Sequence, residues 1–209
     1  MEQNLNLNNV KLIGRFEKNF ELENVVKGRK IYSSFMLVHR LSGVVDRVPV
    51  CINEEQFKRF PKDVRGSKYL VEGYIITALY PDKIIVSVKI ISDIIQVDNS
   101  VKDKNEVEIE GHVWVPHIRM SFKSERVICD FKLLCSSAYS KFARIPCIAW
   151  GNNAVKIYRF SNDTKVYIKG RFQNRIVRKL VNNTYCQVYQ YELSVNYFEA
   201  FQNDTSKGY

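Results

Sequence analysis

Several features that mark metalloproteins and membrane proteins are scarce in this sequence. Its 209 residues include 3 histidines and 5 cysteines, with no C-x-x-C pair and no His, Cys or carboxylate grouping at a metal-ligand spacing. No segment approaches the run of about 20 apolar residues that a membrane span needs, and the N-terminus lacks a basic region followed by an apolar one. We therefore expect a cytoplasmic protein without a metal or another cofactor.

The sequence also shows no grouping of side chains that suits phosphodiester cleavage. Phosphodiester cleavage needs carboxylates placed to bind a metal ion, and no Asp/Glu/His cluster stands out. We therefore expect a non-enzymatic protein. The odd number of cysteines, most of them inside apolar runs, favours reduced, buried thiols over disulfides. These are Cys51, Cys129, Cys135, Cys147 and Cys186.

Apolar residues and positive charge are abundant. Apolar residues make up 45% of the chain and aromatic residues 12%, which is enough for a folded core. The net charge is +10, with 15 basic against 12 acidic residues in 1–100 and 17 against 10 in 101–209. Such a field favours polyanions such as nucleic acid or an anionic membrane surface, although solubilising charge is an equally good interpretation of this fact alone.

An internal repeat organises the chain. Gly14 returns as Gly111, and the segments 47–52 and 68–73 return as 144–149 and 165–170, always with an offset of 97 residues. Phe35 and Phe131 differ by 96, as expected if loops changed length in diverged copies of one fold. The repeat predicts two similar domains at 1–98 and 106–202, a polar linker at 99–105 and a short tail at 203–209.

The pattern within each copy is typical of an all-β domain. Apolar residues alternate with polar ones around Val10 and Leu12, and again around Val107 and Ile109. One short helix per copy is indicated, at 54–60 with Asn53 as its cap and at 154–160 with Asn152 or Asn153 as its cap. Three strands, a helix and a two-strand hairpin predict two tandem OB-fold five-stranded β-barrels.

Three motifs in this order resemble the bacterial single-stranded DNA-binding protein family, in a tandem two-OB-fold version. The segment 10–16 (VKLIGRF) is similar to the family's first strand. The segment 145–151 (IPCIAWG) is similar to its third strand, which ends in an aromatic-Gly pair, and 170–175 (GRFQNR) is similar to its fourth strand. The resemblance implies sequence-independent binding of single-stranded DNA in replication, recombination or repair, with a nucleoid-associated location.

The resemblance also implies which aromatic residues stack on bases. They are Tyr139 and Trp150, with Phe142 as a substitute for a platform whose position holds Arg144. Val177 stands where a further stacking aromatic is expected, and the first copy lacks the aromatic-Gly pair altogether. Because Trp150 ends an apolar run, burial in the core is the alternative interpretation.

Basic side chains that can neutralise phosphates are densest in the second copy. Residues 175–184 predict a long hairpin arm with an Asn-Asn turn, whereas the arm of the first copy shrinks to a Pro-Asp turn at 78–83. We expect the second domain to make most DNA contacts through Lys156, Arg171, Arg175, Arg178 and Lys179, and the first to add support from Arg15, Arg40 and Arg47.

Other residues receive structural interpretations. Tyr189 and Tyr191 lie at alternate positions with Leu193 and Val195, so all four should face the same side of a strand. This pattern predicts that the two tyrosines pack in the core. The four repeated glycines are expected to serve barrel bends. They are Gly14, Gly73, Gly111 and Gly170.

Three questions of function and assembly stay open at this point. An accessory protein of replication restart or of a mobile genetic element, acting mainly through protein contacts, would have the same pattern. An OB-fold nuclease or RNA-binding protein is a further alternative, because stacking and phosphate contacts do not select against the 2′-OH. Residues 201–209 carry little charge, so we expect no acidic tail that recruits replication or repair proteins. We expect a homodimer with four barrels, with a monomer as the alternative.

Overall fold

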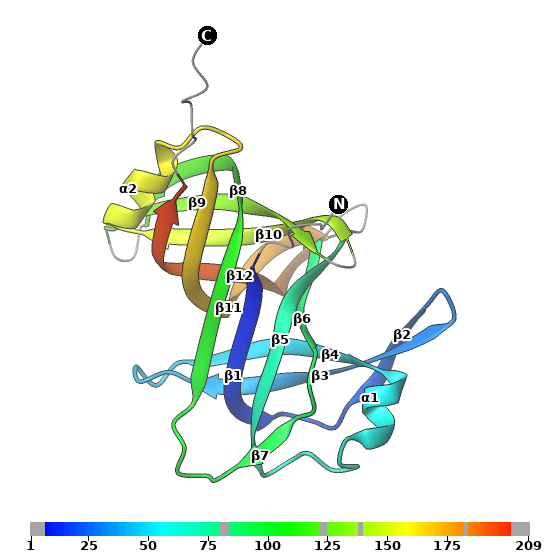
Figure 1. The fold of residues 1–209 in the computed structure, drawn as a ribbon. Coiled ribbons are helices and arrows are strands. Elements are labelled where there is room, and N and C mark those ends of the chain that lie inside the picture. Colours follow the sequence, from blue (N-terminus) through cyan, green and yellow to red (C-terminus); the bar gives the residue numbers. More distant parts are fainter. Residues whose placement is uncertain (1–6, 80–83, 122–124, 138–139, 182–183, 202–209) are drawn as a thin grey trace.

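The computed structural model describes residues 7–79, 84–121, 125–137, 140–181 and 184–201, with the side chains at 79, 84, 137, 140–142 and 179–181 left out of the description. Figure 1 shows two β-barrels joined by long strands that run through the centre of the molecule. The predicted class is confirmed, since nearly all regular structure is β-strand and each barrel has one short helix.

The first barrel contains five strands in OB order. They are β1 (Asn8–Phe16), β3 (Arg29–His39), β4 (Val45–Asn53), β5 (Lys68–Leu79) and β6 (Ile84–Ile90). The antiparallel pairing of β1 with β5 and the parallel pairing of β4 with β6 close the barrel. Two short strands are added to this frame: β2 (Glu21–Val26) pairs with β3, and β7 (Ile95–Val97) pairs with the start of β5.

The second barrel repeats this order with longer strands. They are β8 (Lys104–Met120), β9 (Val127–Ser137), β10 (Ser140–Trp150), β11 (Lys165–Val181) and β12 (Thr184–Ala200). The pairings β8–β11 and β10–β12 close it in the same way. The β11–β12 hairpin continues to the pair Val181 and Thr184, which gives the second barrel the long arm that the sequence predicts.

Each barrel carries its helix after the third main strand. Helix α1 (Glu54–Arg59) begins with the predicted capping box, in which Asn53 and Gln56 exchange side-chain and backbone hydrogen bonds. Helix α2 (Asn152–Tyr158) begins earlier than predicted. Its N-cap is Gly151 at φ 58°, without a side-chain cap, so the prediction of Asn152 or Asn153 as the cap is wrong. A left-handed cap needs the freedom of glycine.

The two barrels share one sheet, because the first strand of each pairs with the other. Residues 8–13 of β1 run antiparallel to residues 104–109 of β8, with Val10 opposite Val107. These two valines are themselves 97 residues apart, so this pair lies on the two-fold axis that relates the copies. The remainder of each strand pairs within its own barrel, β1 with β3 and β8 with β9.

Near each end of the β1–β8 ladder, an asparagine side chain hydrogen-bonds both the N–H and the C=O group of one residue on a neighbouring strand. The side chain of Asn8 accepts from Ile75 N–H at 2.9 Å and donates to Ile75 C=O at 3.0 Å. The side chain of Asn105 does the same with Phe172, at 2.9 Å and 2.6 Å. Both donor and acceptor positions shift by 97 residues between copies. A side-chain amide thus replaces the main-chain partner that the neighbouring strand no longer provides.

Alternating residues of the strands fill one continuous core across both barrels. A Cβ atom at Gly73 or Gly170 would lie 2.3 Å from a carbonyl oxygen of the neighbouring strand, which agrees with a structural role for these two repeated glycines. All five cysteines are free thiols, but Cys186 on the arm is exposed, so the prediction of buried thiols is wrong there. At that residue, near its start, strand β12 has not yet entered the barrel.

We expect Asn105→Ala to lower the free energy of unfolding by about 1–3 kcal/mol, because it leaves the buried Phe172 amide and carbonyl without partners. Asn9→Ala, on the exposed face of the same sheet, should change it by less than about 0.5 kcal/mol. Urea denaturation of both variants measures the difference. Equal losses would show that the hydrogen bonds of Asn105 to Phe172 have no special role in stability.

Candidate nucleic-acid interface

The hairpin arm of each barrel reaches across to the opposite barrel. Asn174 on β11 accepts the backbone N–H of Arg47 on β4 at 2.8 Å. Thr77 on β5 accepts the backbone N–H of Arg144 on β10 at 3.3 Å. The two contacts are equivalent, since Arg47 and Thr77 become Arg144 and Asn174 after a shift of 97 residues. The outer strands of each barrel and the opposite arm therefore form two related surfaces.

On the first surface, Arg47 lies between aromatic rings of both barrels. Its guanidinium carbon is 3.3 Å from the ring centroid of Phe35 and 5.5 Å from that of Tyr189. An ion pair with Glu17, 2.7 Å between nitrogen and oxygen, holds it there. Burial is the largest single influence on Arg47 and lowers its pKa, but the hydrogen bond and charge of Glu17 and the contact with Tyr191 together exceed it, so the pKa of Arg47 is raised.

The two tyrosines that this surface includes were predicted to be core residues. Tyr191 is half-buried and stacks on the buried Phe172 with ring centroids 6.0 Å apart, in partial agreement. Tyr189 is 52% exposed, so the prediction is wrong for it. Its side chain lies on the same face of β12 as Leu193, but Tyr189 precedes the part of the strand that enters the barrel, so its ring does not face the core.

Within the second barrel, charged side chains of its own hairpin and of strands β8 and β9 bond to one another. Arg119 pairs with Asp130, and Arg175 Nε lies 3.0 Å from Glu192 Oε2 without hydrogen-bond alignment. Gln173 donates to the other oxygen of Glu192 at 2.9 Å. Glu192 is 2% exposed, and this burial raises the pKa of its carboxyl, because Arg175 offsets only part of the desolvation.

A third group of polar residues joins the barrels. Arg40 Nε donates to the buried Asp46 at 2.8 Å, and Arg40 and Arg171 both approach Gln173 Oε1, at 3.3 and 3.2 Å. Burial, with the nearby charge of Arg40, lowers the pKa of Arg171. Arg40 and Arg171, expected on sequence grounds to contact phosphates, thus have partners within the protein.

The other predicted cations differ in how they are engaged. Arg15 donates to the carbonyl of Gly66 and, at 2.8 Å, to Asn99, so it braces a loop. The side chains of Arg144, Lys156 and Arg178 are exposed, and within the described part of the chain no residue forms an ion pair with them. These three cations are therefore accessible to a phosphate. The side chain of Lys179 lies outside the described residues.

Of the predicted stacking aromatics, the structure describes the side chain of Trp150 alone. Trp150 is 37% exposed at the end of β10, where it alternates with the buried Ala149. Tyr139 and the side chain of Phe142 lie outside the described residues. Trp114 on β8, which sequence reasoning missed, is 42% exposed beside a bulge where Val115 has φ 48°. Its strand-like pattern between two valines gave no sign that the ring faces solvent.

Comparison with solved structures shows the fold. The wild-type single-stranded DNA-binding protein from Thermus aquaticus matches with a TM-score of 0.74 at 15% identity, over 98% of this chain and 97% of that one. A deletion mutant of the same protein matches with a TM-score of 0.73 at 17% identity, over 97% and 98%. No protein-family model matches the sequence, and no curated protein is significantly similar to it. The likeness therefore establishes the two-barrel OB architecture.

Two absences hold for the part of the chain that the structure describes. Among those residues, no group of three or more His, Cys, Asp or Glu side chains is arranged to hold a metal ion. No helix among them is long and apolar enough to cross a membrane.

Glu192 gives a testable pH dependence. Its pKa is raised in the folded state, so the stability linked to its proton is complete below the ordinary value of 4.5 and is lost as the pH rises through the folded value. In Glu192→Gln, the free energy of unfolding should therefore rise relative to the wild type with increasing pH. Urea titrations across the acid to neutral range measure this difference, and the exposed Glu199→Gln controls for loss of a carboxylate. A constant difference would contradict the interpretation.

Proposed function

We propose that this protein binds single-stranded DNA without sequence preference and has no catalytic role. The observation that carries the proposal is the exposed Trp150 on an OB-barrel strand that also presents Arg144 to solvent. A ring stacks on any base with a gain of about 1–3 kcal/mol, while cations neutralise phosphates regardless of sequence. The net charge of +10 supports a polyanionic ligand.

The comparison supports the same ligand. The two-barrel protein from Thermus aquaticus, which shares this fold over nearly the whole of both chains, is a single-stranded DNA-binding protein. We propose protection of exposed strands during replication, recombination or repair as the biological role. The second barrel supplies the accessible Lys156 and Arg178, and the first supplies the ring and guanidinium of Phe35 and Arg47.

Titration of fluorescent oligo-dT at two salt concentrations tests the proposal, with duplex DNA and oligo-U as competitors. We expect tight binding to oligo-dT that weakens steeply with salt, and a loss of about 1–3 kcal/mol in Trp150→Ala but not in Trp150→Phe. Arg178→Ala should lower the salt slope by about 1, whereas Arg15→Ala should leave it unchanged. Wild-type protein that ignores oligo-dT at low salt would overturn the proposal.

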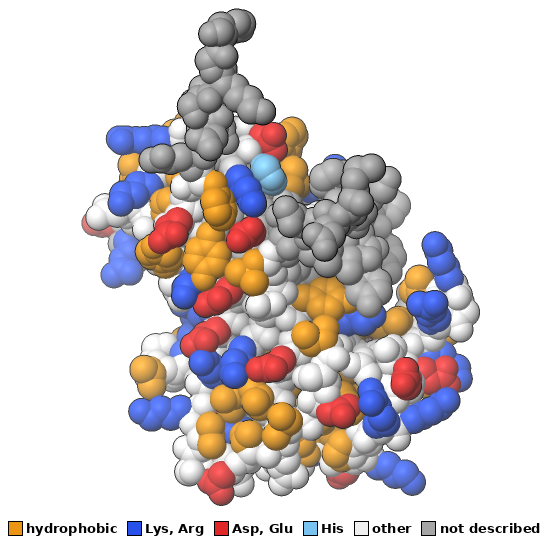
Figure 2. Space-filling view, in the orientation of Figure 1, with side chains coloured by type: hydrophobic (Ala, Val, Ile, Leu, Met, Phe, Trp, Pro, Cys, Tyr) orange, Lys and Arg blue, Asp and Glu red, His pale blue; other side chains and the backbone are white. Residues whose placement is uncertain are grey.

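We also propose that two chains pair through the outer face of the shared sheet. Figure 2 shows acidic, basic and apolar side chains interspersed over this face. Lys11 pairs with Glu72 at 3.2 Å in the first copy, and the equivalent residues Glu108 and Lys169 pair at 3.0 Å with their charges exchanged. A second copy turned onto this face can therefore oppose unlike charges.

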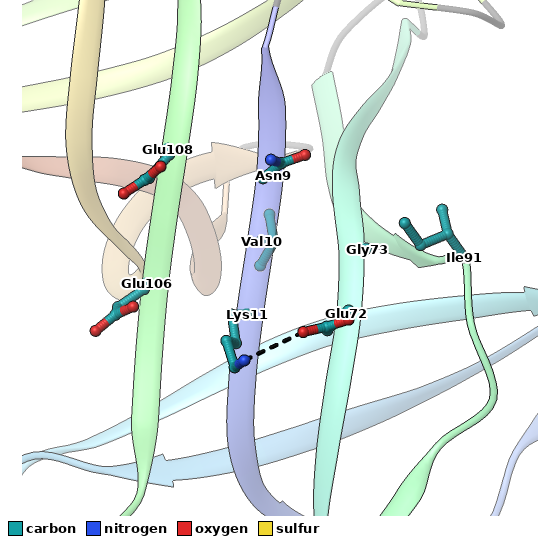
Figure 3. A pocket seen from close by; sticks show the side chains of 8 residues that line it. All are labelled: Asn9, Val10, Lys11, Glu72, Gly73, Ile91, Glu106 and Glu108. Atoms are coloured by element: carbon teal, nitrogen blue, oxygen red, sulfur yellow. Dashed lines mark hydrogen bonds and ion pairs between the residues drawn. The ribbon is translucent and has the colours of Figure 1, made fainter.

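The centre of this face is hollowed next to these charges. Figure 3 shows Lys11 reaching Glu72 across β1 and β5, with Glu106 and Glu108 on the neighbouring strand. The apolar Ile91, 60% exposed, lies at the margin of the hollow. Burial of this apolar side chain and neutralisation of the acidic ones both favour association.

Light scattering should therefore give a mass near twice the 24.5 kDa of one chain. The double variant Lys11→Glu with Lys169→Glu removes both central cations, which makes the centre of the face acidic, and should dissociate the pair. Lys27→Glu with Lys62→Glu, which changes the charge equally at exposed loop positions, should not. A wild-type mass of one chain would refute this assembly.

A further inference from the structure

The β11–β12 hairpin of the second barrel continues well beyond the residues that form the barrel core. The pair formed by Phe172 and Leu193 is fully buried, and it ends the core-facing part of the hairpin. The ladder then continues from Asn174 and Tyr191 to Val181 and Thr184. In the first barrel, the last described pair of the equivalent ladder is Leu79 and Ile84, only four pairs beyond Ile75 and Val88. The extra length therefore requires an explanation other than barrel closure.

One face of this arm is aromatic. Cross-strand partners share a face of a ribbon, and alternate residues of a strand return to it. Tyr189 opposes Ile176, and Gln187 opposes Arg178, with Tyr185 and Tyr191 at alternate positions on β12. We name this face the tyrosine strip, comprising Tyr185, Tyr189, Tyr191, Ile176 and Arg178. Tyr185 is 75% exposed, Ile176 57% and Tyr189 52%.

The strip leads onto the first barrel. Tyr189 and Tyr191 stack with ring centroids 6.5 Å apart and planes 24° from parallel. The guanidinium of Arg47 follows, 5.5 Å from the Tyr189 centroid, and the Phe35 ring lies beneath it. Near the other end, Arg178, Tyr185 and Gln187 line a shallow pocket. Flat groups thus follow one another from the arm to the outer strands of the first barrel.

The charge of the arm selects the class of ligand. Residues 174–191 contain three cations and no Asp or Glu. Of these cations, Arg178 belongs to the strip, whereas Arg175 lies on the other face of the arm and pairs with Glu192. Exposed rings in such numbers are costly in water unless a partner covers them. A chain of flat bases joined by phosphates matches both properties, because rings accept bases by stacking and cations accept phosphates.

We propose that the tyrosine strip is a stacking track that carries one DNA strand from the arm of the second barrel onto Phe35 and Arg47 of the first. This inference rests on the proposed binding of single-stranded DNA. It adds a path between the barrels of one chain, formed by residues of both, to the contact proposed for Trp150.

The test compares two double variants with the wild type. Tyr185→Ala with Tyr189→Ala should weaken binding of an oligo-dT of about 30 nucleotides, longer than one OB fold covers, by at least about five-fold. Tyr185→Phe with Tyr189→Phe keeps the rings and should restore most of the affinity. Tyr197→Ala removes a comparably exposed ring from the opposite part of β12 and should leave affinity unchanged.

A second readout locates the strand directly. Oligo-dT with bromodeoxyuridine substitutions, irradiated in the complex, should cross-link to the peptide that contains residues 185–191. Wild-type protein that binds no oligo-dT would overturn the proposed function itself. Wild-type binding with unchanged affinity in the alanine pair, or with equal losses in the alanine and phenylalanine pairs, would overturn the strip alone.

Discussion

The antiparallel pairing of β1 with β8 is the constraint on which the rest of the molecule depends. It places Val10 opposite Val107 and makes two barrels into one continuous sheet. Strands β1 and β8 then pair both with each other and with strands of their own barrels. Where one of these main-chain ladders stops, the side-chain amides of Asn8 and Asn105 supply the missing hydrogen bonds. Main-chain hydrogen bonds between β1 and β8 therefore set the relative orientation of the two barrels.

The shared sheet brings each hairpin arm over the other barrel. The arm contacts to the backbone of Arg47 and Arg144 are equivalent, but the two surfaces have diverged. The first holds Arg47 between rings from both barrels, whereas the equivalent Arg144 of the second is exposed. Within the second barrel, Arg175 lies beside the buried Glu192. An arginine that already has a carboxylate partner must exchange it for a phosphate, so such residues contribute less to affinity than their number suggests.

The sequence predicted those features that depend on local or repeated signals. The offset of 97 residues predicts two equivalent barrels, and the Asn53 capping box predicts α1. The start of α2 was missed because a left-handed glycine replaces the side-chain cap. Pairing between β1 and β8 could not be predicted, since main-chain ladders between distant strands leave no residue signature. The ion pair of Arg40 with Asp46 depends on packing in the same way, and so does that of Arg175 with Glu192.

Tyr189 shows why strand parity alone does not decide burial. Parity correctly places its ring on the face that continues from Leu193, but β12 extends past the end of the barrel. The same periodicity that fills a core at Leu193 therefore presents rings to solvent nearer the tip of the arm, at the start of β12. An exposed ring has a free energy cost in water that partner binding can recover, and the absence of carboxylates from residues 174–191 directs that binding towards an anion. Lengthening one hairpin of an ordinary barrel is thus enough to convert core-forming periodicity into a surface suited to stacking.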